Sequence, residues 1–282
     1  MKFTKMQGCG NDYVYIDSTK EIIKPLTSKY VADTAIKVSN RNYGIGSDGL
    51  ILIKSSNIAD FTMDMYNADG SSSPMCGNGI RCVGKYVYDY GLTSKTNLKI
   101  ETKAGVKDLE LHLDNGKVKE ITVNMGMPIL EPELIPVKLE GDSIIDREII
   151  VGNDKYNITC VSMGNPHAIV FVNDTKSIDI EKIGPLFENH EIFPERVNTE
   201  FIKVVDRKTL DMRVWERGSG ETLACGTGAC ASVVASVLNN LTEDKVTVRL
   251  LGGDLEIFYD RNGKTVYMTG PAVTVYEGEI KI

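Results

Sequence analysis

Short runs of alternating apolar and polar residues, bounded by Gly, Asn and Asp, dominate the chain and predict β-strands. In the first half these runs lie at residues 2–6, 13–17, 50–54, 61–66, 98–102, 106–113 and 117–123. In the second half they lie at residues 156–161, 168–172, 200–205, 210–215, 245–250, 255–259 and 265–268. Helical periodicity is confined to residues 28–38, 77–90, 180–189 and 226–239. Many strands with few helices predict an α+β fold.

Two of the predicted helices begin with the same kind of turn. The sequence Cys-Gly-Asn-Gly at residues 76–79 opens one, and Cys-Gly-Thr-Gly at residues 225–228 opens the other, 149 residues further along the chain. The same offset aligns the strands that lead into the turns, pairing Met63 with Met212, Tyr66 with Trp215 and Asn67 with Glu216. Self-similarity at half the chain length predicts an internal duplication into two like domains.

A segment with three prolines, residues 125–136, is the natural crossing between the two domains. We therefore expect an N-terminal half over residues 1–126, with the first Cys-Gly turn, and a C-terminal half over residues 127–270, with the second. Another alternating run closes the chain at residues 271–282, and it could return to either half.

Composition narrows the class of protein. The chain has 282 residues, of which 42% are hydrophobic and 25% charged, which is typical of globular domains and excludes intrinsic disorder. A net charge of −7 leaves no general basic field for nucleic acid or anionic lipid. No signal peptide or membrane span is visible, so we expect a cytoplasmic protein whose six Cys are free thiols.

The two Cys-Gly turns predict a particular chemistry. A Cys at a helix start faces unpaired backbone N–H groups and the positive end of the helix dipole, so its pKa is expected to fall below about 8.5. Glycines after the Cys leave the same N–H groups open to a ligand carboxylate. Two such thiols on opposite faces of one carbon could invert a stereocentre, one as thiolate base and the other as thiol acid.

The motifs of the chain resemble those of the diaminopimelate epimerase family. They lie at residues 5–12 (Lys-Met-Gln-Gly-Cys-Gly-Asn-Asp), 66–71, 75–82, 164–167 (Gly-Asn-Pro-His), 196–198 and 216–229, and so cover nearly the whole chain. The resemblance implies a fold of two pseudo-symmetric barrel-like halves, each a curved, mostly antiparallel sheet around a central helix. It also implies interconversion of LL- and meso-diaminopimelate for lysine and peptidoglycan synthesis, without pyridoxal phosphate or metal, in an enzyme that is commonly a homodimer.

The same resemblance assigns the site residues. Cys76 and Cys225 would be the acid/base pair, and His167 and Glu216 would prepare the two thiols for proton transfer. The reacting carboxylate would be held by backbone amides of Gly77, Asn78, Gly226 and Thr227. The distal amino acid group of the substrate would be bound by Asn11, Asn67, Asn165, Asn198, Glu216 and Arg217. These types suit a zwitterion, because Arg217 can fork onto a carboxylate and Glu216 can accept from an ammonium group.

The chain departs from the family pattern at two positions. Gln7 stands where the family usually has His, and Gly49 stands where some members have a Gln that contacts substrate. We leave both residues out of the expected site.

Other readings of the same residues remain open at this stage. Cys9, Cys82, Cys160 and Cys230 lie on apolar faces and are expected to pack in the core. A zinc site is disfavoured, because the Cys spacings lack the usual short pairs. The alternatives for the function are a proline racemase-like or broader amino acid racemase of the same fold, and a non-catalytic thiol redox protein.

Overall fold

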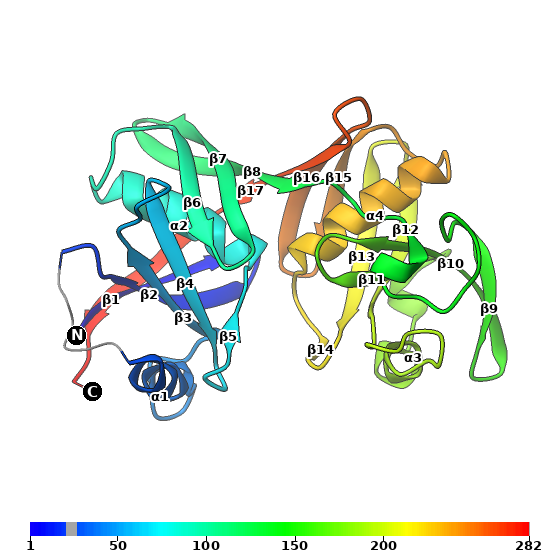
Figure 1. The fold of residues 1–282 in the computed structure, drawn as a ribbon, viewed down its shortest axis with the longest axis horizontal. Helices are drawn as coiled ribbons and strands as arrows, with labels where there is room; N and C mark the ends of the chain where they lie inside the picture. The colour runs from blue at the N-terminus through cyan, green and yellow to red at the C-terminus, as the bar shows by residue number, and fades with distance from the viewer. Residues whose placement is uncertain (21–26, 282) are drawn as a thin grey trace. The chain divides into compact units, whose positions relative to one another are not determined.

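The computed structural model describes residues 1–20 and 27–281, and it divides into two compact units. Unit 1 comprises Met1–Val123 together with Gly270–Ile282, and unit 2 comprises Asn124–Thr269. The colours of Figure 1 follow this division, because the blue and cyan part is completed by the red C-terminal strand. Unit 2 is therefore a continuous stretch of chain, whereas unit 1 is built from both ends.

The sheet of unit 1 has the strand order β18-β1-β2-β3-β4-β6-β7-β8. Neighbours are antiparallel except for the parallel pairs β2–β3 and β4–β6. The short β5 forms a hairpin with the end of β4. The strands are β1 (Lys2–Gly8), β2 (Asn11–Asp17), β3 (Gly49–Lys54), β4 (Phe61–Asn67), β5 (Ser72–Ser73), β6 (Asn97–Thr102), β7 (Gly105–Asp114), β8 (Lys117–Gly126) and β18 (Val273–Glu279).

Unit 2 repeats this topology with the strand order β9-β10-β11-β12-β13-β15-β16-β17. Its parallel pairs, β11–β12 and β13–β15, fall at the same places in the order, and β14 pairs with the end of β13 as β5 does with β4. The strands are β9 (Arg147–Val151), β10 (Asp154–Ser162), β11 (Pro166–Phe171), β12 (Asn198–Asp206), β13 (Thr209–Glu216), β14 (Gly220–Glu221), β15 (Lys245–Leu250), β16 (Gly253–Asp260) and β17 (Thr265–Pro271). The repeat of the Cys-Gly turns is thus part of a repeated topology.

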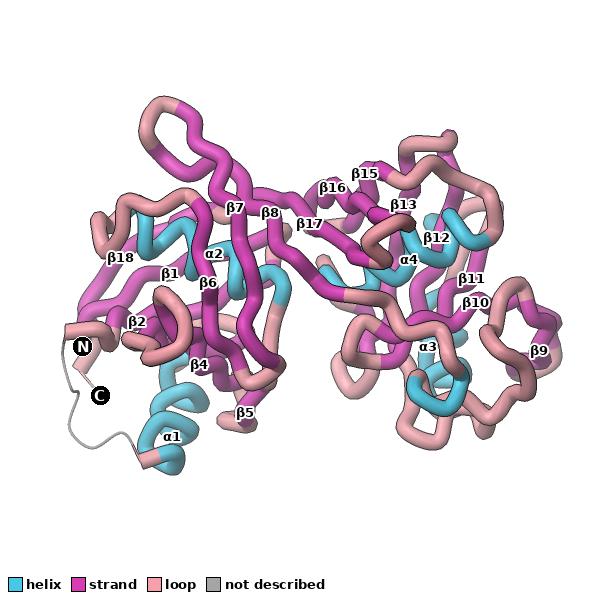
Figure 2. Tube along the Cα trace, turned by 45° about the horizontal axis from the view of Figure 1, so that its top comes forward, coloured by secondary structure: helices cyan, strands magenta, loops and turns pink. Residues whose placement is uncertain are grey.

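Each sheet curves around a central helix. In unit 1, α2 (Gly77–Asp89) packs against β1 and β2 and also against β7, which lies near the other end of the strand order. In unit 2, α4 (Gly226–Leu238) packs against β10, β11 and β12 and against β15 and β16. Figure 2 shows each helix with the strands of its own unit around it. The central helices are largely buried, and small residues such as Ala229 and Ala231 let the strands approach α4 closely.

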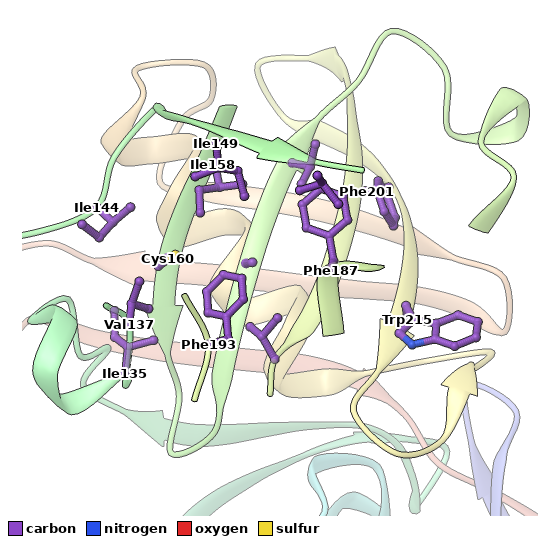
Figure 3. Packing of buried hydrophobic residues seen from close by; sticks show 14 of the residues in the cluster. Ile135, Val137, Ile144, Ile149, Ile158, Cys160, Phe187, Phe193, Phe201 and Trp215 are labelled. Atoms are coloured by element: carbon purple, nitrogen blue, oxygen red, sulfur yellow. The ribbon is translucent and has the colours of Figure 1, made fainter. Parts of the chain in front are cut away.

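A second helix covers the outer face of each sheet. In unit 1, α1 (Ser28–Ser39) places Val31, Ala35 and Val38 against apolar residues of β2–β4. In unit 2, α3 (Ile180–Glu188) places Phe187 against Phe201 and lies so close to Trp215 that a Cβ at Gly184 would be 2.3 Å from its ring. Figure 3 shows this cluster around Phe187 and Phe193. Two single-turn 3-10 helices, η1 (Pro132–Leu134) and η2 (Thr175–Ser177), complete unit 2.

The observed elements lie close to those that the alternation pattern predicts. All four helices and all fourteen predicted strands are present, with shifts of a few residues at their ends. The pattern missed β9 and the two-residue strands β5 and β14. The last predicted strand is β18, which pairs with β1, and Ile282 falls outside the described residues.

Within the described residues, none of the helices combines the length and the apolar character needed to cross a lipid bilayer.

Candidate active site

The sulfurs of Cys76 and Cys225 occupy equivalent positions in the two units. Each Cys has extended backbone torsions and caps the N-terminus of a central helix, Cys76 on α2 and Cys225 on α4. Each sulfur accepts a hydrogen bond from the amide three residues later, Gly79 or Gly228, with an S···N distance of 3.4 Å in both cases. A sulfur in this position sits at the positive end of the helix dipole. The predicted helix-start position of both thiols is confirmed.

The last glycine of each Cys-Gly turn lets the central helix approach the sheet. A Cβ at Gly79 would lie 2.8 Å from Ile51 Cδ1, and a Cβ at Gly228 would lie 2.4 Å from Glu200 Oε1. Both separations are too short for a Cβ unless the Ile51 or Glu200 side chain moves, so glycine allows this close approach without displacing either one. The backbone N–H groups of the first helical turn, at residues 77–78 and 226–227, have no acceptor within their own helix. They are therefore suited to bind a carboxylate.

A polar network positions Asn11 beside the first thiol. The Cys76 thiol donates to Asn11 Oδ1 at 3.3 Å, and Asn11 Nδ2 donates to Asp48 Oδ2 at 2.7 Å. Asp48 also accepts from the backbone N–H of Asp12 at 3.0 Å and from Arg41 at 2.9 Å. Burial raises the pKa of the Asp48 carboxyl, and the nearby Asp12 charge adds to that shift. Sequence reasoning missed Asp48, which fixes the orientation of a predicted binding residue.

The registers of β2, β3 and β4 bring Asn11, Gly49 and Asn67 to one end of the unit 1 sheet. Tyr13 pairs with Gly49 across β2–β3, and Gly49 pairs with Asn67 across β3–β4. A Cβ at Gly49 would lie 2.2 Å from the carbonyl oxygen of Tyr66, so this backbone accepts no side chain and the departure from Gln is structural. Asn67 is half-buried and donates to Ser71 Oγ at 3.0 Å.

Gln7, the other departure, supports a turn. Its side-chain Oε1 accepts a hydrogen bond from the backbone N–H of Gly10 at 2.8 Å, at the turn between β1 and β2. Gly10 there has a φ of 83°, in the left-handed region that favours glycine. Gln7 therefore holds the turn that leads into Asn11.

Arg81 forms hydrogen bonds that support the first turn of α2. Its side chain is fully buried, and its Nη1 donates to the carbonyl oxygen of Gly77 at 3.2 Å. Its Nη2 donates to Asn78 Oδ1 at 2.9 Å, and its Nε to the carbonyl oxygen of Pro271 at 3.2 Å. The Asn78 side chain is thus held within unit 1, while its backbone N–H belongs to the helix start. Arg81 lies within a quoted sequence motif, but its spacing alone gave no sign of this role.

In unit 2, a chain of polar contacts connects His167 to the second thiol. His167 is fully buried, and its Nδ1 lies 2.7 Å from Oε1 of Glu200, which is also fully buried. His167 Nε2 lies 3.1 Å from Asn165 Oδ1, and Asn165 Nδ2 donates to Thr227 Oγ1 at 3.3 Å. Thr227 Oγ1 in turn lies 3.5 Å from Cys225 Sγ. Asn165, His167, Thr227 and Cys225, which the sequence separates by up to 62 residues, therefore form one connected cluster.

Acidic groups surround the second thiol. A ring nitrogen of His167, a carboxylate oxygen of Glu200 and the sulfur of Cys225 all lie within 4.8 Å of one another, and Glu216 lies close to Cys225. Desolvation raises the pKa of the partly buried Glu216, and the charge of Glu200 raises it further. The hydroxyl of Thr222 donates to Glu216 Oε1 and thereby limits that shift.

The expectation of a lowered pKa is wrong for Cys225. Burial raises the pKa of the Cys225 thiol well above its usual value, and the charges of Glu216 and Glu200 raise it further. The hydrogen bonds from Gly228 and Thr227 act in the opposite direction but are the smaller contributions. The sequence shows the helix start that favours thiolate, but burial and two carboxylates from neighbouring strands outweigh it.

Iodoacetamide is therefore expected to alkylate Cys76 faster than Cys225 near neutral pH. Only the thiolate reacts, and a raised pKa keeps Cys225 protonated until the pH is strongly alkaline, whereas Cys76 is also the more exposed of the two. Mass spectrometry of timed digests between about pH 7 and pH 10 should show labelling of Cys225 rising with pH. Cys160, 1% exposed and with its pKa raised by burial, serves as an unreactive control. Equal labelling rates for Cys76 and Cys225 at pH 7 would contradict a protonated Cys225 thiol at that pH.

Asn198 and Arg217 form a separate part of the unit 2 site. The Asn198 side chain is buried, donates to the carbonyl oxygen of Pro166 at 2.7 Å and accepts from the backbone N–H of Arg217 at 3.0 Å. Arg217 Nη1 donates to the carbonyl oxygen of Glu195 at 2.9 Å. Asn198 therefore fixes the backbone that carries the Arg217 guanidinium.

The predicted residues thus form two sets. Unit 1 carries Asn11, Asn67, Cys76, Gly77 and Asn78, and unit 2 carries the remaining ones, namely Asn165, His167, Asn198, Glu216, Arg217, Cys225, Gly226 and Thr227. The other four Cys are buried, in agreement with their predicted packing role. Within unit 2, sequence reasoning missed Glu200.

Comparisons with known proteins identify the family. The family model described as diaminopimelate epimerase matches residues 3–131 and 159–275. The chain is 54% identical to a diaminopimelate epimerase of Acetivibrio thermocellus, over 100% of this chain and 99% of the relative. It is 55% identical to a diaminopimelate epimerase of Methanococcus maripaludis, with both chains fully covered. A crystal structure of a probable proline racemase from Agrobacterium radiobacter shares the fold, with a TM-score of 0.69 at 15% identity and coverage of 100% and 93%. The chain belongs to the diaminopimelate epimerase family.

Proposed function

We propose that the protein interconverts LL- and meso-diaminopimelate by proton transfer between the substrate and two thiols, Cys76 and Cys225. One observation carries this proposal. The two units repeat one topology, and in each unit a Cys caps the N-terminus of the central helix. Epimerases are isomerases, and this reaction needs one group to remove a proton from the α-carbon and another to supply one from the opposite face.

The charge states of the site indicate how the reaction starts. Because its pKa is raised, Cys225 holds its proton near neutral pH and acts as the acid in the resting enzyme. In this proposal Cys76 is the base: once it has released its own thiol proton to solvent, it takes the α-proton, and Cys225 delivers its proton to the other face of the carbon. Protons balance, since one leaves and one arrives, and in the reverse direction the thiols exchange roles. First-turn amides at residues 77–78 and 226–227 stabilise the negative charge that develops on the reacting carboxylate.

The distal end of the substrate is a second amino acid group, and polar side chains of both units suit it. The Arg217 guanidinium can form a forked pair with a carboxylate, and Glu216 can accept from an ammonium group. Asn11, Asn67, Asn165 and Asn198 offer both donors and acceptors.

We further propose that the protein works in the reducing cytoplasm as a homodimer, in the synthesis of lysine and of peptidoglycan precursors. Both thiols must stay reduced for proton transfer, and all six Cys are free thiols in the structure. The dimer follows from the family resemblance.

Incubation of the reduced protein with LL-diaminopimelate in deuterated water tests this function. We expect formation of the meso isomer with one solvent deuteron at the inverted carbon, detected by chiral chromatography and mass spectrometry. Proline and other monocarboxylic amino acids serve as control substrates and should not exchange. Exchange of proline would favour a broader racemase, and a reversible disulfide without turnover of any amino acid would favour a thiol redox protein; either result would overturn the proposal.

A further inference from the structure

Glu200 is a buried carboxylate that the reaction as described above does not use. It lies on β12, is fully buried, and its Oε1 lies against the first turn of α4, where a Cβ at Gly228 would be only 2.4 Å away. Among the described residues, its Oε2 is buried without a hydrogen-bond partner. Burial of a carboxylate costs free energy that a single hydrogen bond does not fully offset. A carboxylate in this position therefore calls for an explanation.

The hydrogen bond to His167 shows what the carboxylate does locally. Glu200 Oε1 lies 2.7 Å from His167 Nδ1, and an ionised carboxylate oxygen can only accept. The ring must therefore carry a hydrogen on Nδ1. Its Nε2 lies 3.1 Å from Asn165 Oδ1, which also can only accept, so this contact is a hydrogen bond when Nε2 carries a hydrogen as well. From Asn165 the polar contacts continue through Thr227 to the Cys225 thiol. The charged or titratable groups around the ring are Glu200 on β12, Glu216 on β13 and Cys225 at the start of α4.

Unit 1 shows that the fold itself does not require a carboxylate at this position. Tyr13 pairs with Gly49 across β2–β3, as His167 pairs with Asn198 across β11–β12. Two residues further along β3 stands Ile51, and two residues further along β12 stands Glu200. Ile51 approaches Gly79 as Glu200 approaches Gly228. The same structural position is apolar in unit 1 and acidic only in the unit that carries His167.

We propose that Glu200 is a positioning residue for the epimerase reaction, which holds the His167 ring with a hydrogen on Nδ1 and directs Nε2 toward Asn165, from which polar contacts continue through Thr227 to the Cys225 thiol. This inference rests on the proposed function, because the reaction that His167 serves is that of the two thiols. Glu200 does not touch the substrate, and its effect passes through the imidazole. Its replacement should therefore lower kcat more than it changes KM.

The ring signals of His167 test the arrangement without substrate. The chain has three His, so the 15N resonances of His167 are assigned by comparison with variants that lack His112 or His190. In the unmodified protein Nδ1 should have the shift of a protonated nitrogen. In Glu200→Met, which removes the acceptor and keeps an apolar side chain of similar size, that signature should be lost. An unprotonated Nδ1 in the unmodified protein would overturn the proposal even if the variant fails to fold.

Kinetics of matched variants test the consequence for catalysis. Glu200→Met should lower kcat by about 10- to 100-fold, the range seen when the partner that orients a metal-binding histidine is removed, with KM changed by less than about 3-fold. Glu200→Gln, which keeps an oxygen acceptor, should recover most of that loss. Thr199→Val changes the neighbouring buried residue on β12 and should leave kcat unchanged. Full kcat in Glu200→Met would overturn the proposal.

A double-mutant cycle separates positioning from a structural role. If Glu200 acts through the imidazole, adding Glu200→Met to a His167→Asn variant should lower kcat by less than about 2-fold, because the interaction is already lost. An equal loss in both backgrounds would show an independent structural effect and would contradict the proposal. Unmodified protein that does not epimerise diaminopimelate would overturn the proposed function together with this inference. Active protein whose Glu200→Met variant keeps full kcat would overturn this inference alone.

Discussion

Replacement of Cys76 or of Cys225 by alanine is expected to lower kcat for epimerisation by about 10⁴-fold, the upper range for loss of a general acid or base. Each sulfur caps a central helix, and no other thiol among the described residues stands at such a helix start. The loss should be equally severe in both directions of the reaction, because each thiol serves as acid in one direction and as base in the other. Formation of meso from LL isomer, followed by chiral chromatography, measures it.

The single variants should differ in hydrogen exchange even though both fail to epimerise. A protein with one remaining thiol can still remove and return a proton on one face, so each variant should exchange the α-hydrogen of one epimer without inverting it. Cys160→Ala is the matched control, because Cys160 packs in the unit 2 core (Figure 3) and its loss should leave kcat unchanged. Full epimerisation by either Cys76→Ala or Cys225→Ala would contradict the two-thiol reaction.

Replacement of Arg81 by methionine is expected to lower the free energy of unfolding by about 3 kcal/mol, because the buried Gly77 carbonyl oxygen, the buried Asn78 Oδ1 and the partly buried Pro271 carbonyl oxygen each lose a donor. Loss of this support should also raise KM, since the proposed reaction uses the amides of residues 77–78 to bind the reacting carboxylate. Urea denaturation of the reduced protein gives the stability, and initial rates give KM.

Arg261→Met provides the comparison for this variant. Arg261 is exposed and its guanidinium pairs with Asp244 at the surface, where an ion pair contributes little, so its loss should change the free energy of unfolding by less than about 1 kcal/mol. If Arg81→Met and Arg261→Met have the same urea midpoint, the hydrogen bonds of Arg81 do not support the helix start.

Local sequence signals predicted the elements of the fold and the location of both thiols. The Cys-Gly turns marked the starts of α2 and α4, because glycine and a capping side chain act through the nearest residues. Alternation marked the strands of both sheets, but it missed β9, whose residues Arg147–Val151 pair with β10 at the edge of the described sheet of unit 2. The parallel pairs, such as β2–β3, depend on contacts between distant segments, which alternation does not reveal.

The electrostatics of the site could not be predicted from the neighbours of each residue in sequence. Cys225 meets Glu200 because β12 packs against α4, and burial there reverses the expected direction of the Cys225 pKa shift. One signal was available: the 149-residue offset that relates the two turns also sets Glu200 against Ile51. A carboxylate opposite an apolar residue in a repeat is a sign of function that the alignment of the two halves could have provided.

The division of the chain has a consequence for the order in which the protein matures during synthesis on the ribosome. Unit 2 is continuous and can complete its sheet as soon as it has emerged. Unit 1 begins first, yet its strand β18 and the Pro271 carbonyl that Arg81 binds are translated only after the whole of unit 2. The half that begins first is therefore completed after the other half, and the helix start that carries Cys76 lacks the Arg81–Pro271 contact until β18 has emerged.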